Sequence, residues 1–171
     1  EYARTVLDMM VREIRLAGYN PTATNSGANC AGTPTAGAPG VVTATGTLFK
    51  FTADYRGTTS GSVSNGTCSN PDEEITYQYQ TPGPQACSGG AGDIIRTANG
   101  TSEPITDCNV TNLAFEYYDQ DTSTPMSPIV AADIKRVKIT VTLRSKNPDG
   151  EFGGQLTTTV YSSVKLRNRG L

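Results

Sequence analysis

The sequence predicts an α+β fold in which one N-terminal amphipathic helix packs across antiparallel β-sheet. The first residues carry apolar side chains at helical spacing, and the last third alternates apolar and polar residues at strand spacing. The length of 171 residues suits one domain with one core. We therefore expect a single globular domain over residues 1–171, with a helix at 1–18, a loop at 19–46 and mainly antiparallel sheet with loops at 47–171.

The N-terminal segment has one continuous apolar side. Its apolar residues recur at alternating steps of four and three, which places them on one helix face: Ala3, Leu7, Met10, Ile14 and Ala17. Gly18 suits the left-handed position after the last turn, and Pro21 prevents the helix from resuming. No capping Ser, Thr, Asp or Asn stands before the first turn, so we expect the helix to continue upstream of Glu1.

The middle of the chain alternates short strand patterns with polar loops. The Gly-, Thr- and Pro-rich segment 19–46 is interpreted as a loop that can end in a short strand at 41–45. Alternation predicts further strands at 47–54, 74–80, 93–97, 105–108 and 110–119. Tyr77 and Tyr79 fall on the apolar side of their strand, which favours core packing. Tyr117 and Tyr118 point to opposite faces, so one of the two is expected at the surface.

The last third has the clearest strand pattern. In 133–145 apolar and polar residues alternate strictly, with Val137, Ile139, Val141 and Leu143 on one side. In 155–168 one face carries Leu156, Thr158, Val160, Ser162, Val164 and Leu166. A Pro-Asp-Gly turn signal lies between the two segments, which predicts a long antiparallel hairpin with one buried and one solvated face. The buried face supplies the apolar surface that the helix stripe requires.

Four cysteines, Cys30, Cys68, Cys87 and Cys108, lie in Gly-, Ser- and Asn-rich surroundings without a C-x-x-C motif. Their even number and polar neighbours favour two disulfides and therefore an exported protein. Four cysteines allow three pairings. We favour Cys30–Cys68 and Cys87–Cys108, because each then links loops that flank a predicted strand pair. The lack of His and of a close cysteine pair disfavours zinc.

The composition also disfavours several function classes. Because the chain has no His, Ser-His-Asp and Cys-His arrangements are excluded within it. No phosphate-cradling glycine motif occurs, and we expect no enzyme, no catalytic residue and no cofactor. The net charge of −2 disfavours nucleic acid as a partner. No apolar run of membrane-spanning length is present.

Two segments carry alternate oxygen donors of the kind that bind Ca²⁺. Asp119 and Asp121 are two residues apart in one segment, and Asn147 and Asp149 in the other. Neither segment matches the twelve-residue EF-hand pattern, and ordinary Asx turns at strand ends produce the same spacing. We favour the turn interpretation and keep a calcium site as the minority alternative.

Charge is distributed unevenly along the chain. Residues 51–134 carry two basic and eleven acidic side chains, whereas residues 135–171 carry eight basic and two acidic ones. Complementary patches that orient one subunit against the next would explain this asymmetry. A basic solvent face on the closing hairpin explains it equally well, with Lys138, Arg144, Lys165 and Arg167 on that face.

Several segments together carry a family resemblance. These are "VREIRLAGYNP" at the helix end, "LAFEYYDQD" in a middle strand, and "DIKRVKITVTLRSKNPDG" with "TTVYSSVKLRNRGL" in the closing hairpin. The chain resembles minor type IV pilins and minor pseudopilins of the PilW and GspJ kind over its first 21 and last 65 residues. The resemblance implies a pilin-like head. It also implies a full-length protein with a short leader, about 25 apolar residues that span the membrane, and a methylated N-terminus.

The resemblance further implies a structural role for the chain. Such subunits stand in the inner membrane of a Gram-negative bacterium facing the periplasm, then stack into an extracellular filament, with minor subunits priming assembly at the tip. Its partners would be other minor and major pilins or pseudopilins, met through head surfaces and the helix stripe from Ala3 to Ala17. The alternative is an extracellular adhesin on the same fold, binding through the loops at 20–46 and 55–73. Pilus, secretion and DNA-uptake filaments all remain open.

Overall fold

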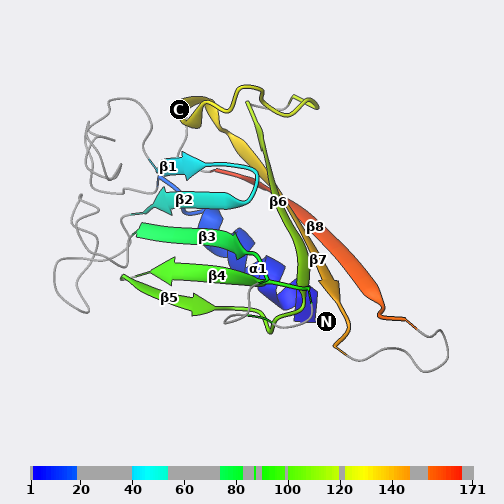
Figure 1. Cartoon of the computed structure of the whole chain (residues 1–171). Coiled ribbons are helices and arrows are strands. Elements are labelled where there is room, and N and C mark those ends of the chain that lie inside the picture. Colours follow the sequence, from blue (N-terminus) through cyan, green and yellow to red (C-terminus); the bar gives the residue numbers. More distant parts are fainter. Residues whose placement is uncertain are drawn as a thin grey trace.

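The structure, a computed structural model, describes residues 2–18, 40–53, 74–82, 87, 90–98, 100–119, 122–146 and 154–166. Within these residues the chain forms one α-helix and two antiparallel sheets, which confirms the predicted α+β class (Figure 1). The strands are β1 (Val41–Ala44), β2 (Leu48–Thr52), β3 (Glu74–Gln80), β4 (Asp93–Ala98), β5 (Thr101–Pro104), β6 (Val110–Tyr118), β7 (Arg136–Arg144) and β8 (Thr157–Lys165). One sheet has the order β1-β2-β3-β4-β5, and the other has the order β6-β7-β8.

The helix α1 (Tyr2–Ile14) ends earlier than the predicted residue 18, and a tighter turn completes it. Leu16 and Ala17 donate their backbone N–H groups to carbonyls three residues back, as in the final turn of many helices. Gly18 then adopts the predicted left-handed conformation, with φ +78°, and donates its N–H to Thr52 O at 2.9 Å. A Cβ on Gly40 would lie 2.1 Å from Gly18 N, so the helix end and β1 approach each other only through glycine.

The apolar side of α1 lies inside the molecule, as predicted. Figure 1 shows α1 passing behind β3 and β4, and the helix also packs against β7 and β8. The buried residues form one continuous core that includes the helix stripe and the inward faces of both sheets. The two sheets therefore share a single helical cover.

An aromatic cluster joins the two sheets. The ring centroid of Phe49 on β2 lies 5.5 Å from that of Phe51, 5.9 Å from Phe115 and 5.6 Å from Tyr117 on β6. Such spacings are typical of favourable aromatic pairs. The Tyr117 hydroxyl also donates to Thr45 O at 2.7 Å in the β1–β2 turn.

One strand prediction is confirmed and another needs correction. The short strand expected at 41–45, at the end of the loop segment 19–46, is β1. The predicted strand at 105–108 is wrong, and β5 lies just before it instead. Cys108 has φ +48°, which an extended strand does not permit. Beyond β5, the Thr106 hydroxyl accepts the N–H of Ile94 at 2.8 Å. A side-chain oxygen thus takes the place of the backbone carbonyl that would accept this N–H if the β4–β5 ladder continued.

The expectation that Tyr117 or Tyr118 would be exposed is also wrong. Their exposed fractions are 1% and 5%. Tyr118 does point away from the main core, but the guanidinium of Arg136 covers its ring at 3.9 Å from the centroid. A neighbouring long side chain therefore buries an aromatic ring on a face that alternation predicts to be solvated.

The closing hairpin follows its predicted pattern along β7 but only partly along β8. Val164 and Leu166 are buried and Val160 and Ser162 are half-buried, whereas Leu156 is 54% exposed. In Figure 1 the end of the hairpin where β7 leads to β8 projects beyond α1. The predicted apolar face is therefore covered only where the helix reaches it.

Replacing Met10 by Ala tests the role of α1 as a common cover. Met10 is fully buried, so Met10→Ala should lower the free energy of unfolding by about 2–5 kcal/mol. Asp8→Ala on the exposed side of the same helix should change it by less than about 0.5 kcal/mol. Urea denaturation of both purified variants measures the difference. Equal midpoints would contradict the packing described here.

Candidate functional site

The helix stripe expected to contact other subunits is occupied within this chain. Ala3, Leu7, Met10, Ile14 and Ala17 all lie in the core, with exposed fractions from 0% to 8%. The stripe packs on sheet, as predicted, so most of its surface is not accessible to a second molecule. The exposed side of α1 carries Arg4, Asp8 and Arg12, followed by Arg15. The exposed surface of α1 is therefore mainly charged, with Tyr2 and Leu16 also exposed.

One carboxylate on the inner half of α1 anchors the helix to the five-stranded sheet. Glu13 accepts two hydrogen bonds from Arg96 on β4, at 3.1 Å from Nε and 3.0 Å from Nη2. The hydroxyl of Tyr77 on β3 donates to the same carboxylate at 2.5 Å. Bidentate Arg–carboxylate pairs set both distance and orientation. We call Glu13, Tyr77 and Arg96 the helix clamp.

The surroundings of the helix clamp keep the Tyr77 phenol protonated and Arg96 charged, as their hydrogen bonds to Glu13 require. Burial, and then the neighbouring Glu13 charge, raises the pKa of the Tyr77 phenol far above its usual range. The hydrogen bond to Glu13 raises the pKa of Arg96, which stays charged in any case. The clamp therefore joins one anion, one cation and one neutral phenol.

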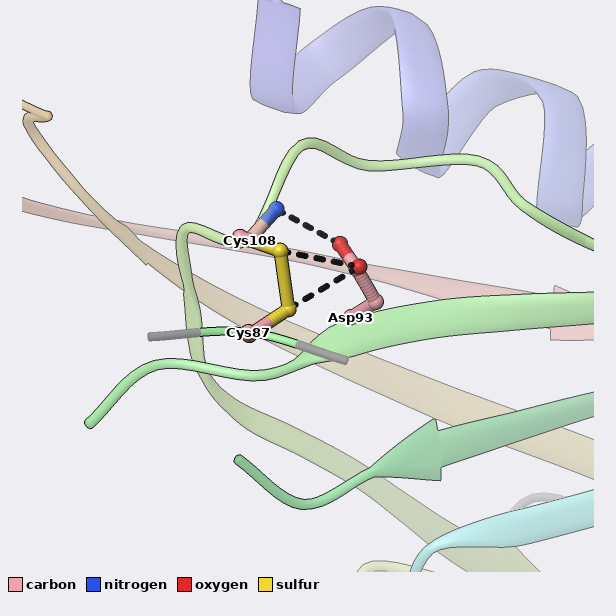
Figure 2. A group of neighbouring side chains, drawn as sticks. All are labelled: Cys87, Asp93 and Cys108. Carbon is pink, nitrogen blue, oxygen red and sulfur yellow. Dashed lines mark hydrogen bonds between the residues drawn. A yellow bond between two sulfur atoms is a disulfide. The ribbon is translucent and has the colours of Figure 1, made fainter. Parts of the chain in front are cut away.

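The second candidate site surrounds a disulfide. Cys87 and Cys108 are bonded, with Cα atoms 5.3 Å apart, which confirms one of the two favoured pairs. Cys30 and Cys68 lie outside the described residues, so their expected pairing stays a prediction. Figure 2 shows the Asp93 side chain at the start of β4 directed at this disulfide. Closing a loop with a sequence separation of 21 stabilises the fold by about 3 kcal/mol on a chain-entropy estimate.

Asp93 organises the backbone that leads to the disulfide. Its Oδ1 accepts the Thr106 hydroxyl at 2.8 Å and the Cys108 N–H at 2.7 Å. Its Oδ2 lies 3.1 Å from Cys87 Sγ and 3.4 Å from Cys108 Sγ. Disulfide sulfurs carry no hydrogen, so Oδ2 packs against them without receiving a proton. With only 6% of Asp93 exposed, this carboxyl group is a structural acceptor inside the fold.

The same three residues do not form a metal centre while the disulfide is intact. One ligand atom from each of Cys87, Asp93 and Cys108 lies within 4.8 Å of the others. Soft metals bind thiolates, and both sulfurs are bonded to each other here. The arrangement thus stabilises a bend in the chain rather than presenting ligands.

The calcium candidates are only partly described. Asp119 is exposed, and its backbone carbonyl accepts the Thr122 hydroxyl at 3.0 Å. This bond uses the backbone of Asp119 and not its side chain, so the Asx-turn and calcium interpretations both stay predictions. Asp121, Asn147 and Asp149 lie outside the described residues, as do the loop residues 20–39 and 55–73 considered for an adhesin.

A shallow hollow of about 600 Å³ lies along β3, β4 and β5. It is lined mainly by amides and hydroxyls, with Gln78, Gln80, Thr97 and Ser102 among them. Thr97 and Ser102 bond each other across the strands at 2.7 Å. No activated nucleophile with an adjacent base occurs among these described lining residues.

Part of the charge asymmetry is neutralised inside the molecule. Lys138 on β7 pairs with Glu116 on β6 at 2.5 Å, and Lys146 pairs with Asp107. Each pair joins a residue from the basic segment 135–171 to one from the acidic segment 51–134. Arg167 lies outside the described residues. Some of the acidic and basic side chains therefore serve contacts between segments of this same chain.

Comparison with protein-family models, with curated proteins and with solved structures finds no match to this chain. Sequence reasoning also missed the partners of Glu13 and Asp93. Glu13 is one of three acids in the predicted helix 1–18, and Asp93 is the one acid in the predicted strand 93–97. The one available signal was the position of Asp93 between two cysteines, at the start of a predicted strand.

Replacing Asp93 by Asn tests its role as an internal acceptor. Asn retains the oxygen that Thr106 and Cys108 use, but it places an amide N–H₂ against the disulfide sulfurs, which are weak acceptors. We expect Asp93→Asn to lower the free energy of unfolding by about 1–3 kcal/mol. Asp107→Asn is the matched control, because its exposed ion pair with Lys146 contributes at most about 1 kcal/mol. Thermal unfolding with the disulfide intact compares them, and equal losses would refute the assignment.

Stability should fall at alkaline pH because two tyrosines are buried as neutral phenols. Burial raises the pKa of both Tyr77 and Tyr117 in the folded state. Below about pH 10 both states keep these protons, and above it only the unfolded state releases them. Each residue then lowers the free energy of unfolding by about 1.4 kcal/mol per pH unit.

Urea denaturation at a series of pH values measures this slope. Tyr77→Phe should reduce this slope by about 1.4 kcal/mol per pH unit, which is the contribution of one tyrosine. A flat profile above pH 10 in the unmodified chain would show that these phenols ionise without unfolding.

Proposed function

We propose that this chain is the periplasmic head of a minor type IV pilin or pseudopilin, a structural subunit that assembles with other such subunits and primes assembly at the filament tip. The sequence resemblance at the helix end, the middle strand and the closing hairpin supports the proposal. The arrangement of one N-terminal helix on antiparallel sheets is consistent with it. The proposal places the head first at the inner membrane and then in an extracellular filament.

The observation that carries the proposal is the rigid attachment of α1 to the head. A subunit that is pulled from a membrane by its helix transmits force through the contacts between helix and head. Here the helix contributes five fully integrated core residues. The helix clamp adds a bidentate ion pair to β4 and a phenol hydrogen bond to β3, both in the five-stranded sheet.

The helix clamp specifically opposes sliding and rotation of the helix. Apolar packing is non-directional and tolerates small shifts along the interface. A bidentate guanidinium–carboxylate pair allows one orientation, and both side chains are largely buried, with 20% and 25% of Arg96 and Glu13 exposed. The clamp therefore fixes the position of α1 on the sheet, as a force-bearing connection requires.

The disulfide fits the same role. It closes the segment between β3 and β6 next to the internal acceptor Asp93. Disulfides persist in oxidising compartments outside the cytosol, which agrees with a periplasmic and extracellular head. A structural subunit requires surfaces that contact its neighbours and a stable fold, and it requires no catalytic group.

Gene deletion with clamp variants tests the proposal. Deletion should lower the number of surface filaments, or the export of a secreted substrate, by at least about tenfold, and the unmodified gene should restore it. Glu13→Arg and Arg96→Glu should each fail to restore assembly, because each leaves like charges at a largely buried site. The double exchange Glu13→Arg/Arg96→Glu reinstates an opposite-charge pair and should restore assembly in part.

Thermal unfolding of the purified heads separates misfolding from failed assembly. Arg12→Glu on the exposed side of α1 is the control for a charge change without loss of the clamp. Normal filament number and normal export in the deletion strain would contradict the proposed function.

A further inference from the structure

Among the described residues the strand β8 pairs only with β7, so its other hydrogen-bonding edge has no strand partner there. Leu166 N donates to Lys135 O at 2.9 Å, and Ser145 N donates to Leu156 O at 2.7 Å. These pairs lie at opposite ends of the β7–β8 register. Because antiparallel partners alternate between bonded and non-bonded pairs, the even-numbered residues of β8 direct their backbone groups at β7. Thr157, Thr159, Tyr161 and Ser163 therefore direct theirs away from the sheet.

Among the described strands, the other sheet edges are short or covered. On the outer edge of β6, Val110 exchanges backbone bonds with Gly92, Phe115 N donates to Gly46 O, and Tyr117 O accepts the N–H of Met126. The edge strand β5 has four residues and ends in Pro104, and β1 also has four. By contrast β8 is nine residues long and contains no Pro. Long edges without such protection are sites where another strand adds.

A groove runs beside this edge on the inner side of the sheet. Its volume is about 350 Å³, and it is lined by Arg4, Leu7 and Asp8 of α1 and by Thr159 to Ser162 of β8. A strand added to β8 would place alternate side chains over Leu7 and Val160. The geometry combines an open strand edge with a neighbouring helix, as in known peptide-binding grooves that use strand addition.

The other face of the same sheet is basic. Arg136, Lys138 and Arg144 on β7 and Lys165 on β8 stand on it, opposed by Glu116 on β6. An added strand would lie two strand spacings, or about 10 Å, from β7. The long basic side chains of β7 therefore reach toward carboxylates on the added strand. An added strand therefore gains from apolar residues toward α1 and acidic residues toward the basic face.

We propose that β8 and α1 form a docking groove for an extended, acidic β-strand of a different protein. The strand pairs with Thr157, Thr159, Tyr161 and Ser163 and alternates apolar with acidic side chains. A second copy of this chain is a poorer occupant. Antiparallel β8–β8 pairing would bring two basic faces together, and among the described residues β5 offers only four residues as a donor edge. This inference stands independently of the filament proposal.

A titration of the isotope-labelled chain with synthetic peptides tests the groove. The probe is a nine-residue peptide that alternates Val with Glu, and the matched peptide carries Lys in place of Glu. We expect the amide signals of Thr157, Thr159, Tyr161 and Ser163 to shift with the acidic peptide. The acidic peptide should bind at least about tenfold more tightly than the basic one, and this preference should shrink as salt rises.

N-methylation of the peptide tests strand pairing without altering the protein. Methylation on the residues whose N–H groups face β8 should lower affinity at least about tenfold, and methylation on the alternate residues should leave it unchanged. Tyr161→Pro removes a backbone N–H that points away from β7, so no bond within the sheet is lost. This substitution should also lower peptide affinity at least about tenfold. Ser102→Pro on β5 is the matched control and should bind normally.

Three results would overturn the inference. One is the lack of any shift at about 1 mM acidic peptide. Another is a set of shifts that maps away from β8 and α1. The third is concentration-dependent shifting of the same amides without peptide, which would make a second copy the occupant instead of a different protein.

Discussion

The sharing of α1 between two sheets is the constraint on which the rest of the structure depends. A 13-residue helix in water is marginal by itself, so its order comes from the surfaces it covers. Burying one large apolar side chain contributes about 1.5–3 kcal/mol, and the stripe supplies several. Without α1, the inner faces of both sheets would meet water. Helix and sheets therefore stabilise one another as a unit, and the aromatic cluster around Phe49 is the second connection between the sheets.

Polar contacts decide how that unit is aligned. Glu13 stands close to the buried stripe, where a lone carboxylate would destabilise the fold. Arg96 and Tyr77 satisfy it with three hydrogen bonds, which are possible at only one helix position. Largely buried ion pairs add little net stability when compared with apolar packing. The clamp therefore contributes mainly to specificity: it selects one setting of α1 among those that apolar packing alone would allow. Asp93 acts in the same way on the chain around the disulfide.

The periodic parts of the sequence predicted the helix and most strands, because burial on one face leaves a repeat of 3.6 or 2 in the residue order. The failures occur where side chains replace backbone contacts. Thr106 and Asp93 take over the bonds that a strand at 105–108 would have made. Tyr118 is buried by a long side chain from the neighbouring strand, which periodicity does not encode. The partners of Glu13 lie 64 and 83 residues away in sequence, so no local pattern could indicate them.

The charge asymmetry acquires a different meaning once the pairs are known. Glu74 pairs with Lys50, Glu103 with Arg96, Asp107 with Lys146 and Glu116 with Lys138. Asp93 is buried against the disulfide. Much of the described acidity of segment 51–134 is thus engaged inside the molecule.

Heterologous assembly requires two different surfaces that complement each other. This chain presents a basic face, an open strand edge and the charged side of α1 next to one another, since Arg4 and Asp8 line the groove beside β8. Backbone pairing along the edge would set direction and register, while the basic face would select acidic sequences. Under the two proposals, the complementary acidic strand comes from another protein, and in the proposed filament of unlike subunits such pairing would make the order of neighbours specific.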